Sequence, residues 1–205
     1  MTIKQALEPI VARPRIHAQA AIVCVAIASA AASLLAQPGL RGAVGALLAL
    51  VMLAIAIVDA RWRIIPNELN AVAFALALAQ AAIQSPDAVT QALAVAALRG
   101  GALALLFLGL RVAYRYWRGR EGIGLGDVKL AGVAGAWLDW LTIPIAIEIA
   151  ALSALAAYGV RQYWLGGRLR PTTRLPFGLF FAPAIWLGWL IETLILVPPY
   201  GAALF

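Results

Sequence analysis

The sequence predicts an all-α, polytopic membrane protein, a single bundle of about seven transmembrane helices. Three observations predict this class: an apolar composition, a series of apolar runs near the length of a bilayer crossing, and alternating positive charge. Hydrophobic residues make up 64% and charged residues 12% of the 205 residues, against about 45–50% and about 25% in soluble domains. A soluble fold of this size cannot bury so much apolar surface, which excludes a soluble enzyme and a disordered tail.

Seven apolar runs come close to the roughly 20 residues that a helix needs to cross a bilayer. They are residues 18–36, 41–58, 67–84, 88–114, 128–141, 142–163 and 176–197. The connections are short, so we expect one integral-membrane domain over 1–205, with a cytoplasmic tail at 1–17 and a helix bundle at 18–197. We expect 18–36 to be a retained anchor; a cleaved signal peptide is the alternative, because Ala28-Ser29-Ala30 resembles a cleavage site.

Lysine and arginine orient the bundle, because cytoplasmic loops of membrane proteins carry an excess of both. Fourteen of the 16 cations fall on alternate connections, beginning with the N-terminal tail; the exceptions are Arg41 and Arg99. This pattern predicts a cytoplasmic N-terminus, and it assigns the net charge of +7 to loops and not to nucleic-acid binding. It also predicts a hairpin near Asp139, because one long helix over 128–165 would put the arginines of 161–174 outside.

Two aspartates fall at the same predicted face. Asp59 follows the second apolar run and Asp127 precedes the fifth, and the charge pattern puts both at cytoplasmic helix ends. The fifth helix is expected to be short, because Val128–Trp140 spans only about 20 Å at 1.5 Å per residue. We therefore expect Asp127 to lie below the headgroups, in a water-filled depression of the bilayer surface.

Few other side chains could carry chemistry. One cysteine, Cys24, and one histidine, His17, leave little room for a thiolate metal cluster or a Ser-His-Asp triad. Taken singly, Asp59 is more simply an interfacial residue, and Asp127 a helix cap after a glycine-rich loop. Their occurrence as a pair on one side favours a functional site, since acids inside membranes are costly.

A pair of aspartates can hydrolyse a peptide bond without a metal ion. Two carboxyl groups within hydrogen-bond reach share a proton, because both cannot ionise easily. The ionised group can deprotonate a water molecule, while the protonated group donates to the scissile carbonyl and later protonates the leaving amine. Gly124 and Gly126 lack a Cβ, so a substrate backbone can lie close to Asp127.

Three segments resemble the type IV prepilin peptidases, membrane aspartyl proteases of the Gly-x-Gly-Asp class. They are Asp59-x6-Pro66, Gly124-Leu125-Gly126-Asp127-Val128-Lys129-Leu130 and Leu175-Pro176-Phe177-Gly178. The resemblance runs from roughly Val44 to Gly188. It implies that Asp59 and Asp127 are the catalytic pair and that Gly124, Gly126, Lys129 and Pro66 shape the site or bind substrate.

The same resemblance implies a setting and a partner. We expect a multi-pass protein of the bacterial inner membrane, with its active site facing the cytoplasm and neither a cofactor nor a metal. The substrate would be a prepilin or pseudopilin, which loses its basic leader. Only Gln37–Leu40 separates the first two runs, without a cysteine pair. The chain therefore resembles the short, peptidase-only form, and N-methyltransferase activity is not expected.

Other interpretations of the acids stay open at this stage. A small transporter or channel component could use Asp59 and Asp127 as an ion or proton relay, with acids near the middle of the membrane. A structural subunit with two capped helices does not explain why the motifs occur together. Arg99 interrupts the fourth run; it either forms an internal ion pair, with Glu148 as a candidate partner, or snorkels to the interface.

Overall fold

The computed structural model describes residues 3–120, 122–165 and 176–196, which form seven α-helices and no strand. The helices are α1 (Ile3–Ala36), α2 (Leu40–Trp62), α3 (Asn67–Gln84), α4 (Val89–Arg118), α5 (Leu125–Trp137), α6 (Thr142–Leu165) and α7 (Phe177–Ile191). A 3-10 turn at Pro86–Ala88 precedes α4, and a π-helical segment, η2 (Glu192–Leu196), continues α7. The predicted all-α fold class is confirmed, and the described residues form seven α-helices, of which five qualify as candidate membrane spans.

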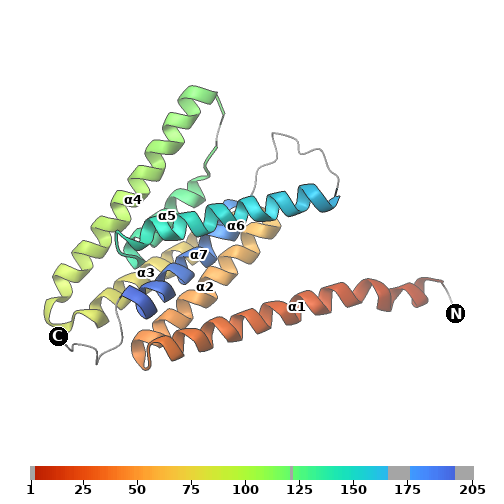
Figure 1. Cartoon of the computed structure of the whole chain (residues 1–205), viewed down its shortest axis with the longest axis horizontal. Helices are drawn as coiled ribbons and strands as arrows, with labels where there is room; N and C mark the ends of the chain where they lie inside the picture. Colours follow the sequence, from red (N-terminus) through yellow and green to blue (C-terminus); the bar gives the residue numbers. More distant parts are fainter. Residues whose placement is uncertain (1–2, 121, 166–175, 197–205) are drawn as a thin grey trace.

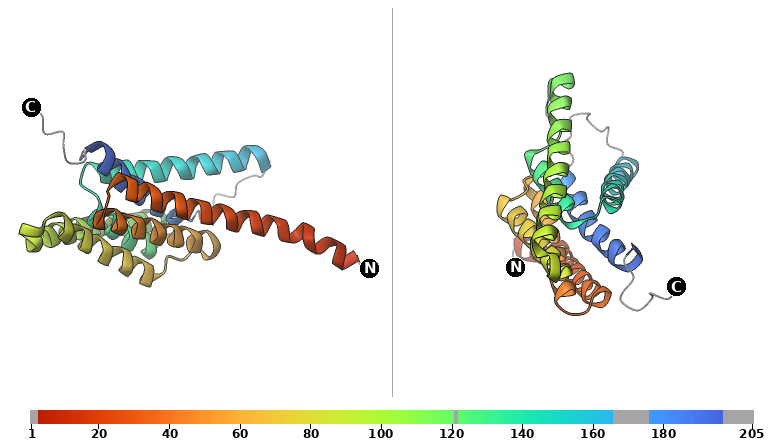
Figure 2. Two further views of the ribbon diagram at one scale, coloured as in Figure 1. Left: turned by 90° about the horizontal axis from the view of Figure 1, so that it is seen from below. Right: turned by 90° about the vertical axis from the view of Figure 1, so that its left-hand side faces the viewer.

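Consecutive helices run in opposite directions through the bundle (Figure 1). The short helix α5 packs against α3, α4 and α7, and α7 in turn contacts α2 and α6. The N-terminal part of α1 and the C-terminal end of α4 extend beyond the other helices (Figure 1 and Figure 2). The result is a bundle in which α5 is the innermost helix, with every residue from Leu130 to Trp137 buried.

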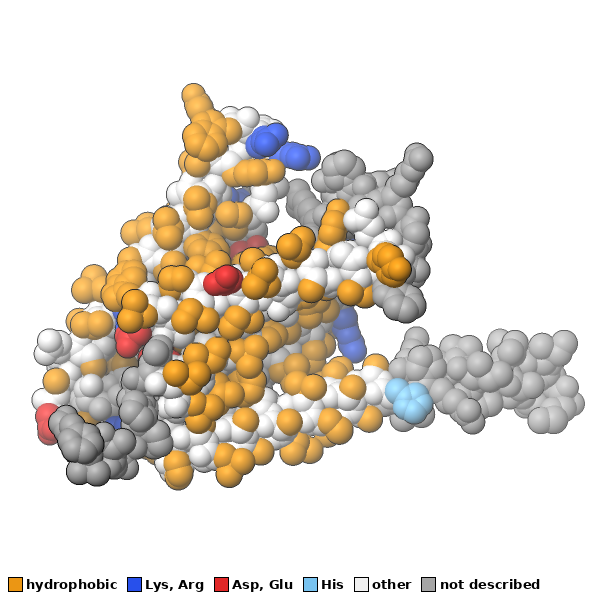
Figure 3. Space-filling view, in the orientation of Figure 1, with side chains coloured by type: hydrophobic (Ala, Val, Ile, Leu, Met, Phe, Trp, Pro, Cys, Tyr) orange, Lys and Arg blue, Asp and Glu red, His pale blue; other side chains and the backbone are white. Residues whose placement is uncertain are grey.

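The core and the outer surface are both apolar. Leu48, Met52, Ile55, Leu130 and Phe181 are fully buried at the centre. Large hydrophobic side chains also cover much of the outside, and Figure 3 shows only scattered charges on the face in view. A surface of this kind is suited to hydrocarbon and not to water.

Five helices are long and apolar enough to cross a membrane, judged by length and composition. They contain the segments His17–Ala36, Leu40–Trp62, Pro86–Arg118, Thr142–Val160 and Phe177–Ile195. The predicted crossings at α3 and α5 do not meet this measure, because α5 has only 13 residues and α3 carries several Asn and Gln side chains. The chain is a multi-pass membrane protein.

Three predicted boundaries differ from the structure. Helix α1 begins at Ile3, so the expected tail at 1–17 continues the first span as a helix. Helix α2 continues to Trp62, which places Asp59 inside its last turn. Helix α5 has the predicted length but starts at Leu125, because the Asp127 carboxylate accepts the N–H of Gly124 and so caps the first turn. The hairpin near Asp139 is confirmed, since α5 ends before it and α6 follows it.

Candidate active site

Asp59 is held in place by the start of another helix. Its side chain is only 5% exposed, and its Oδ2 accepts the backbone N–H of Leu179 at 2.9 Å. Leu179 lies in the first turn of α7, where backbone N–H groups have no partner within the helix. The positive end of the α7 dipole also favours a carboxylate there. The end of α2 is therefore fastened to the beginning of α7 through Asp59.

Asp127 is held by its own helix. It is the third residue of α5, and its Oδ2 accepts the N–H of Gly124, the N-cap residue, at 3.1 Å. A Cβ placed on Gly124 would lie 3.0 Å from that same oxygen. Gly124 thus leaves room for the carboxylate to fold back over the first turn. Both carboxylates therefore accept an N–H group at the start of a helix. For Asp59 this helix is α7, which is distant in sequence, and for Asp127 it is its own helix, α5.

Ile65, a buried residue, connects the two aspartate positions. A Cβ on Gly126 would lie 2.9 Å from the Cβ of Ile65, and a Cβ on Gly178 would lie 2.7 Å from its Cδ1. The Gly178 position also approaches the Oδ2 of Asp59 to 2.9 Å. Ile65 therefore packs between the Gly-x-Gly-Asp segment and the start of α7, and the two aspartates lie at the same end of the bundle.

The charges of the two aspartates interact. Burial raises the pKa of Asp127 to about 6, the hydrogen bond from Gly124 lowers it, and the nearby Asp59 carboxylate raises it. A carboxyl group that keeps its proton close to neutral pH can serve as a proton donor. The arrangement can therefore hold one ionised and one protonated carboxyl group at the same end of the bundle.

The other predicted site residues lie around this end of the bundle. Pro66 is the N-cap residue of α3, and its carbonyl accepts the N–H of Asn70. The Nζ of Lys129 donates to the Oδ1 of Asn67 at 2.6 Å, which links α5 to the first turn of α3. Pro66 and Lys129 thus position helix ends, while Gly124 and Gly126 allow close packing around Asp127. Leu175, the first residue of the third motif, falls outside the described residues.

Sequence reasoning missed two residues of this region. Ile65 is one of the unspecified positions of Asp59-x6-Pro66, and Leu179 contributes only its backbone N–H. The signal available for Leu179 is the start of an apolar helix at Pro176-Phe177-Gly178, because such a start presents free N–H groups. No feature of the sequence marks Ile65 apart from the other apolar residues near Asp59.

Arg99 does not pair with Glu148. Its guanidinium forms an ion pair with Asp139 in the turn between α5 and α6, and its side chain is 15% exposed. Glu148 lies on the exposed side of α6, a helix that packs against α7 and not against α4. Of the two alternatives for Arg99, the structure shows an ion pair, but its partner is Asp139 in an exposed turn and not Glu148.

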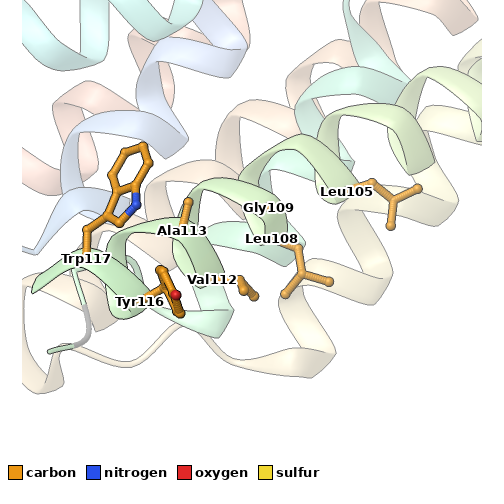
Figure 4. Close-up of a pocket in the computed structure, with 7 residues that line it drawn as sticks. All are labelled: Leu105, Leu108, Gly109, Val112, Ala113, Tyr116 and Trp117. Atoms are coloured by element: carbon orange, nitrogen blue, oxygen red, sulfur yellow. The ribbon is translucent and has the colours of Figure 1, made fainter. Parts of the chain in front are cut away.

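A shallow pocket opens on the surface of α4 (Figure 4). It is lined by residues of that helix alone: Leu105, Leu108, Gly109, Val112, Ala113, Tyr116 and Trp117. The lining is almost entirely apolar, and it includes none of the predicted site residues. None of the residues that hold Asp59 or Asp127 in place lines this hollow.

Comparison with known proteins gives a consistent picture. The sequence profile of the type IV leader peptidase family matches residues 46–160, more than half of the chain. Leader peptidase HopD of Salmonella typhimurium is 33% identical over 134 residues, which cover 65% of this chain and 83% of that protein. No solved structure matches the chain.

Longer relatives are named for two activities, leader peptidase and N-methyltransferase. A prepilin leader peptidase/N-methyltransferase of Pectobacterium carotovorum is 34% identical over 165 residues, covering 78% of this chain and 55% of that protein. A protein of the same name from Burkholderia pseudomallei is 46% identical over 69 residues, 22% of its length. The chain thus spans most of HopD and about half or less of these longer relatives. From the family profile and the extended match to HopD, the chain belongs to the type IV leader peptidase family.

Proposed function

We propose that Asp59 and Asp127 are the catalytic pair of this prepilin-processing protease, and that it acts at the cytoplasmic face of the bacterial inner membrane. One observation carries the proposal: two acids from different helices, one buried and one half-buried, lie at the same end of the bundle. Ile65 packs between their segments and holds the two helix ends together.

The reaction uses one water molecule and one shared proton. The ionised carboxylate takes a proton from the water molecule while the water oxygen attacks the scissile carbonyl carbon. The protonated carboxyl group donates its proton to the carbonyl oxygen. The tetrahedral intermediate then collapses: the C–N bond breaks, the leaving amine takes up a proton from one carboxyl group, and one hydroxyl of the intermediate returns its proton to the other. The products are a leader with a new carboxylic acid, which ionises in water, and a mature protein with a new N-terminal amine, and the pair again holds one proton.

The substrate is a prepilin or pseudopilin whose basic leader precedes an apolar segment. The names of the relatives support this class of substrate. An apolar stem can lie in the bilayer beside the bundle, which would bring the leader junction to the aspartates at the membrane surface. The alternating arginines of the connections support a cytoplasmic location of this end.

A proton or ion relay fits the arrangement less well. Relay acids are expected along a path through the membrane, whereas Asp59 lies in the last turn of α2 and Asp127 in the first turn of α5. At the opposite end, the Asp139 carboxylate pairs with Arg99, and the Glu192 carboxylate accepts the backbone N–H of Asp139. The distribution of acids favours chemistry at one surface.

Reconstitution of the purified chain with a prepilin precursor tests the proposal. We expect one cut directly before the apolar stem, identified by mass spectrometry of both products. A precursor whose leader lysines and arginines are replaced by glutamine serves as the control for leader recognition. Absence of cleavage by the correctly folded chain in lipid would contradict the proposal, as would cleavage only inside the stem.

Accessibility labelling tests the location. A single cysteine at exposed Arg63, in a chain with Cys24→Ser, should react with an impermeant maleimide in inverted inner-membrane vesicles and not in intact spheroplasts. The opposite pattern would place the aspartate end outside the cytoplasm.

We also propose that cleavage occurs without methylation, because the connection between α1 and α2, residues 37–39, is short and contains no cysteine pair. Mature pilin made by the purified chain with S-adenosylmethionine present should have an unmodified N-terminal amine. A product heavier by one methyl group would overturn this part of the proposal.

A further inference from the structure

The end of the bundle opposite the aspartates contains an ion-pair cluster that the proposed reaction does not use. Arg99 of α4 pairs with the Asp139 carboxylate, and the backbone N–H of Asp139 donates to the Oε2 of Glu192 at 3.1 Å. The cluster joins α4, the turn after α5, and the π-helical end of α7. Arg99 lies within an apolar helix, where an unpaired charge is costly, and the cluster gives it a partner.

The contact between α4 and α5 is made by backbone and very small residues. A Cβ on Gly100 would lie 2.7 Å from the carbonyl oxygen of Gly132, and a Cβ on Gly135 would lie 2.5 Å from that of Arg99. Such a surface lets the helices approach closely at these positions, while the larger buried side chains of α4, Leu103 and Phe107, lie farther along that helix. The Arg99 side chain, which reaches Asp139 one turn beyond Gly135, supplies an axial contact.

Helices α5 and α7 run in the same direction (Figure 1) and are of similar length. From Asp127 to Trp137, the last residue of α5, the rise is about 15 Å, and from Leu179 to Ile191, the last residue of α7, it is about 18 Å, at 1.5 Å per residue. At one end, Leu179 binds Asp59; at the other, Glu192 binds the turn after α5. Because a helix transmits a displacement along its axis, a contact that fixes the Asp139 end of α5 also fixes the position of Asp127 along that axis.

We propose that Arg99, Asp139 and Glu192 form a positioning cluster that sets the axial register of α5 against α7, and thereby the separation between Asp127 and Asp59. The expected effect of the cluster on cleavage rests on the proposed function. Its expected effect on the register of α5 rests on the contacts described above. The three residues touch no reacting atom and act only through α5.

The test measures register and cleavage in the same variants. Spin labels at Leu40 and Leu125, two exposed residues at the outer end of α2 and the start of α5, report the axial position of α5 in a Cys24→Ser chain. Arg99→Gln should shift or broaden this distance distribution and lower kcat by about tenfold or more, since small misplacements of catalytic groups are costly. The KM for the precursor should stay within about twofold, because the binding surface is intact.

Conservative and matched variants separate positioning from general damage. Arg99→Lys keeps the charge and should restore both the distance and most of kcat. Glu148→Gln removes an exposed acid that lies on α6 and should change neither quantity. If Arg99→Gln does not insert, Asp139→Asn removes the same ion pair at a side chain that is 61% exposed and should give the same shift.

The outcomes distinguish this inference from the proposed function. An unchanged distance in Arg99→Gln and Asp139→Asn overturns the positioning role, whatever the activity. An equal shift in Glu148→Gln overturns it too, since the effect would not be specific to the cluster. If the parent chain cleaves no precursor, the proposed function fails, while the distance measurement still decides whether the cluster sets the register of α5.

Discussion

The two ends of the bundle hold their acids in different ways. At the aspartate end, Asp59 and Asp127 each accept a backbone N–H, and within the described part of the chain neither forms an ion pair. At the other end, Asp139 is paired with Arg99. An arginine would keep a carboxylate permanently ionised, whereas backbone amides orient a carboxylate and leave it able to take up a proton. The comparison indicates that the first end is built for proton transfer and the second for holding helices.

The largest expected effect comes from removing either proton-transfer group. Asp59→Asn and Asp127→Asn should each reduce cleavage by about 10³-fold or more, because asparagine keeps the shape but cannot exchange the proton. Gel filtration and thermal melting in detergent should show a folded protein in both cases. Cleavage within tenfold of the parent by either variant would remove that aspartate from the mechanism.

A smaller loss of kcat is expected when the Asp59 carboxylate is displaced. In Gly178→Ala the new methyl group would meet the Oδ2 of Asp59 at 2.9 Å and Ile65 at 2.7 Å, so the hydrogen bond from Leu179 should lengthen. Initial-rate measurements should show a fall of about 10- to 100-fold in kcat.

Gly101→Ala is the matched control for Gly178→Ala. It is also a helical glycine, but an added Cβ would meet nothing within 4 Å. Its rate should equal that of the parent. Equal rates for Gly178→Ala and Gly101→Ala would show that close packing at Asp59 does not matter for cleavage.

The kcat/KM for cleavage should also depend on pH, and it should change near the pKa of Asp127. Since Asp127 has a pKa of about 6 beside the Asp59 carboxylate, the pair keeps its single proton below that pH and loses it above. The kcat/KM, which reports the free enzyme, should therefore fall as pH rises through about 6. A kcat/KM that is flat from pH 5 to pH 8 would contradict a shared proton.

The smallest effect is expected where a residue has a structural contact only. Ser33 in α1 accepts the indole N–H of Trp186 in α7 at 3.0 Å, away from the aspartates. Ser33→Ala should lower the free energy of unfolding by about 1–2 kcal/mol, because the indole N–H loses its partner, and leave kcat unchanged. Thermal melting and initial rates measure both, and a kcat reduced at constant stability would show that α1 affects the site.

The sequence was sufficient to predict the helices and the common side of the two aspartates. Apolar runs of bilayer length specify helices directly, because lipid offers no alternative partner for backbone groups. The arginine pattern placed Asp59 and Asp127 on one face without any use of the motifs. Helix ends were less accurate, because the boundary of α5 depends on a local hydrogen bond between Gly124 and Asp127 and not on hydropathy.

Contacts between distant segments could not be predicted in the same way. The bond from Leu179 to Asp59 joins positions 120 residues apart, and the donor is a backbone group that every residue except proline possesses. The partner of Arg99 depended on which side of α6 faces the bundle, which an apolar run does not reveal. Packing between helices decided both contacts.

Titration of the Asp127 carboxyl group, with and without the Asp59 charge, tests the central claim most directly. Aspartate labelled with ¹³C at the carboxyl carbon allows NMR of the detergent-solubilised chain, with the Asp127 signal assigned by its loss in Asp127→Asn. We predict a pKa of about 6 in the parent and a lower value in Asp59→Asn, still above that of an ordinary aspartate because burial remains. The same pKa in both proteins would show that the two carboxyl groups do not act as a pair.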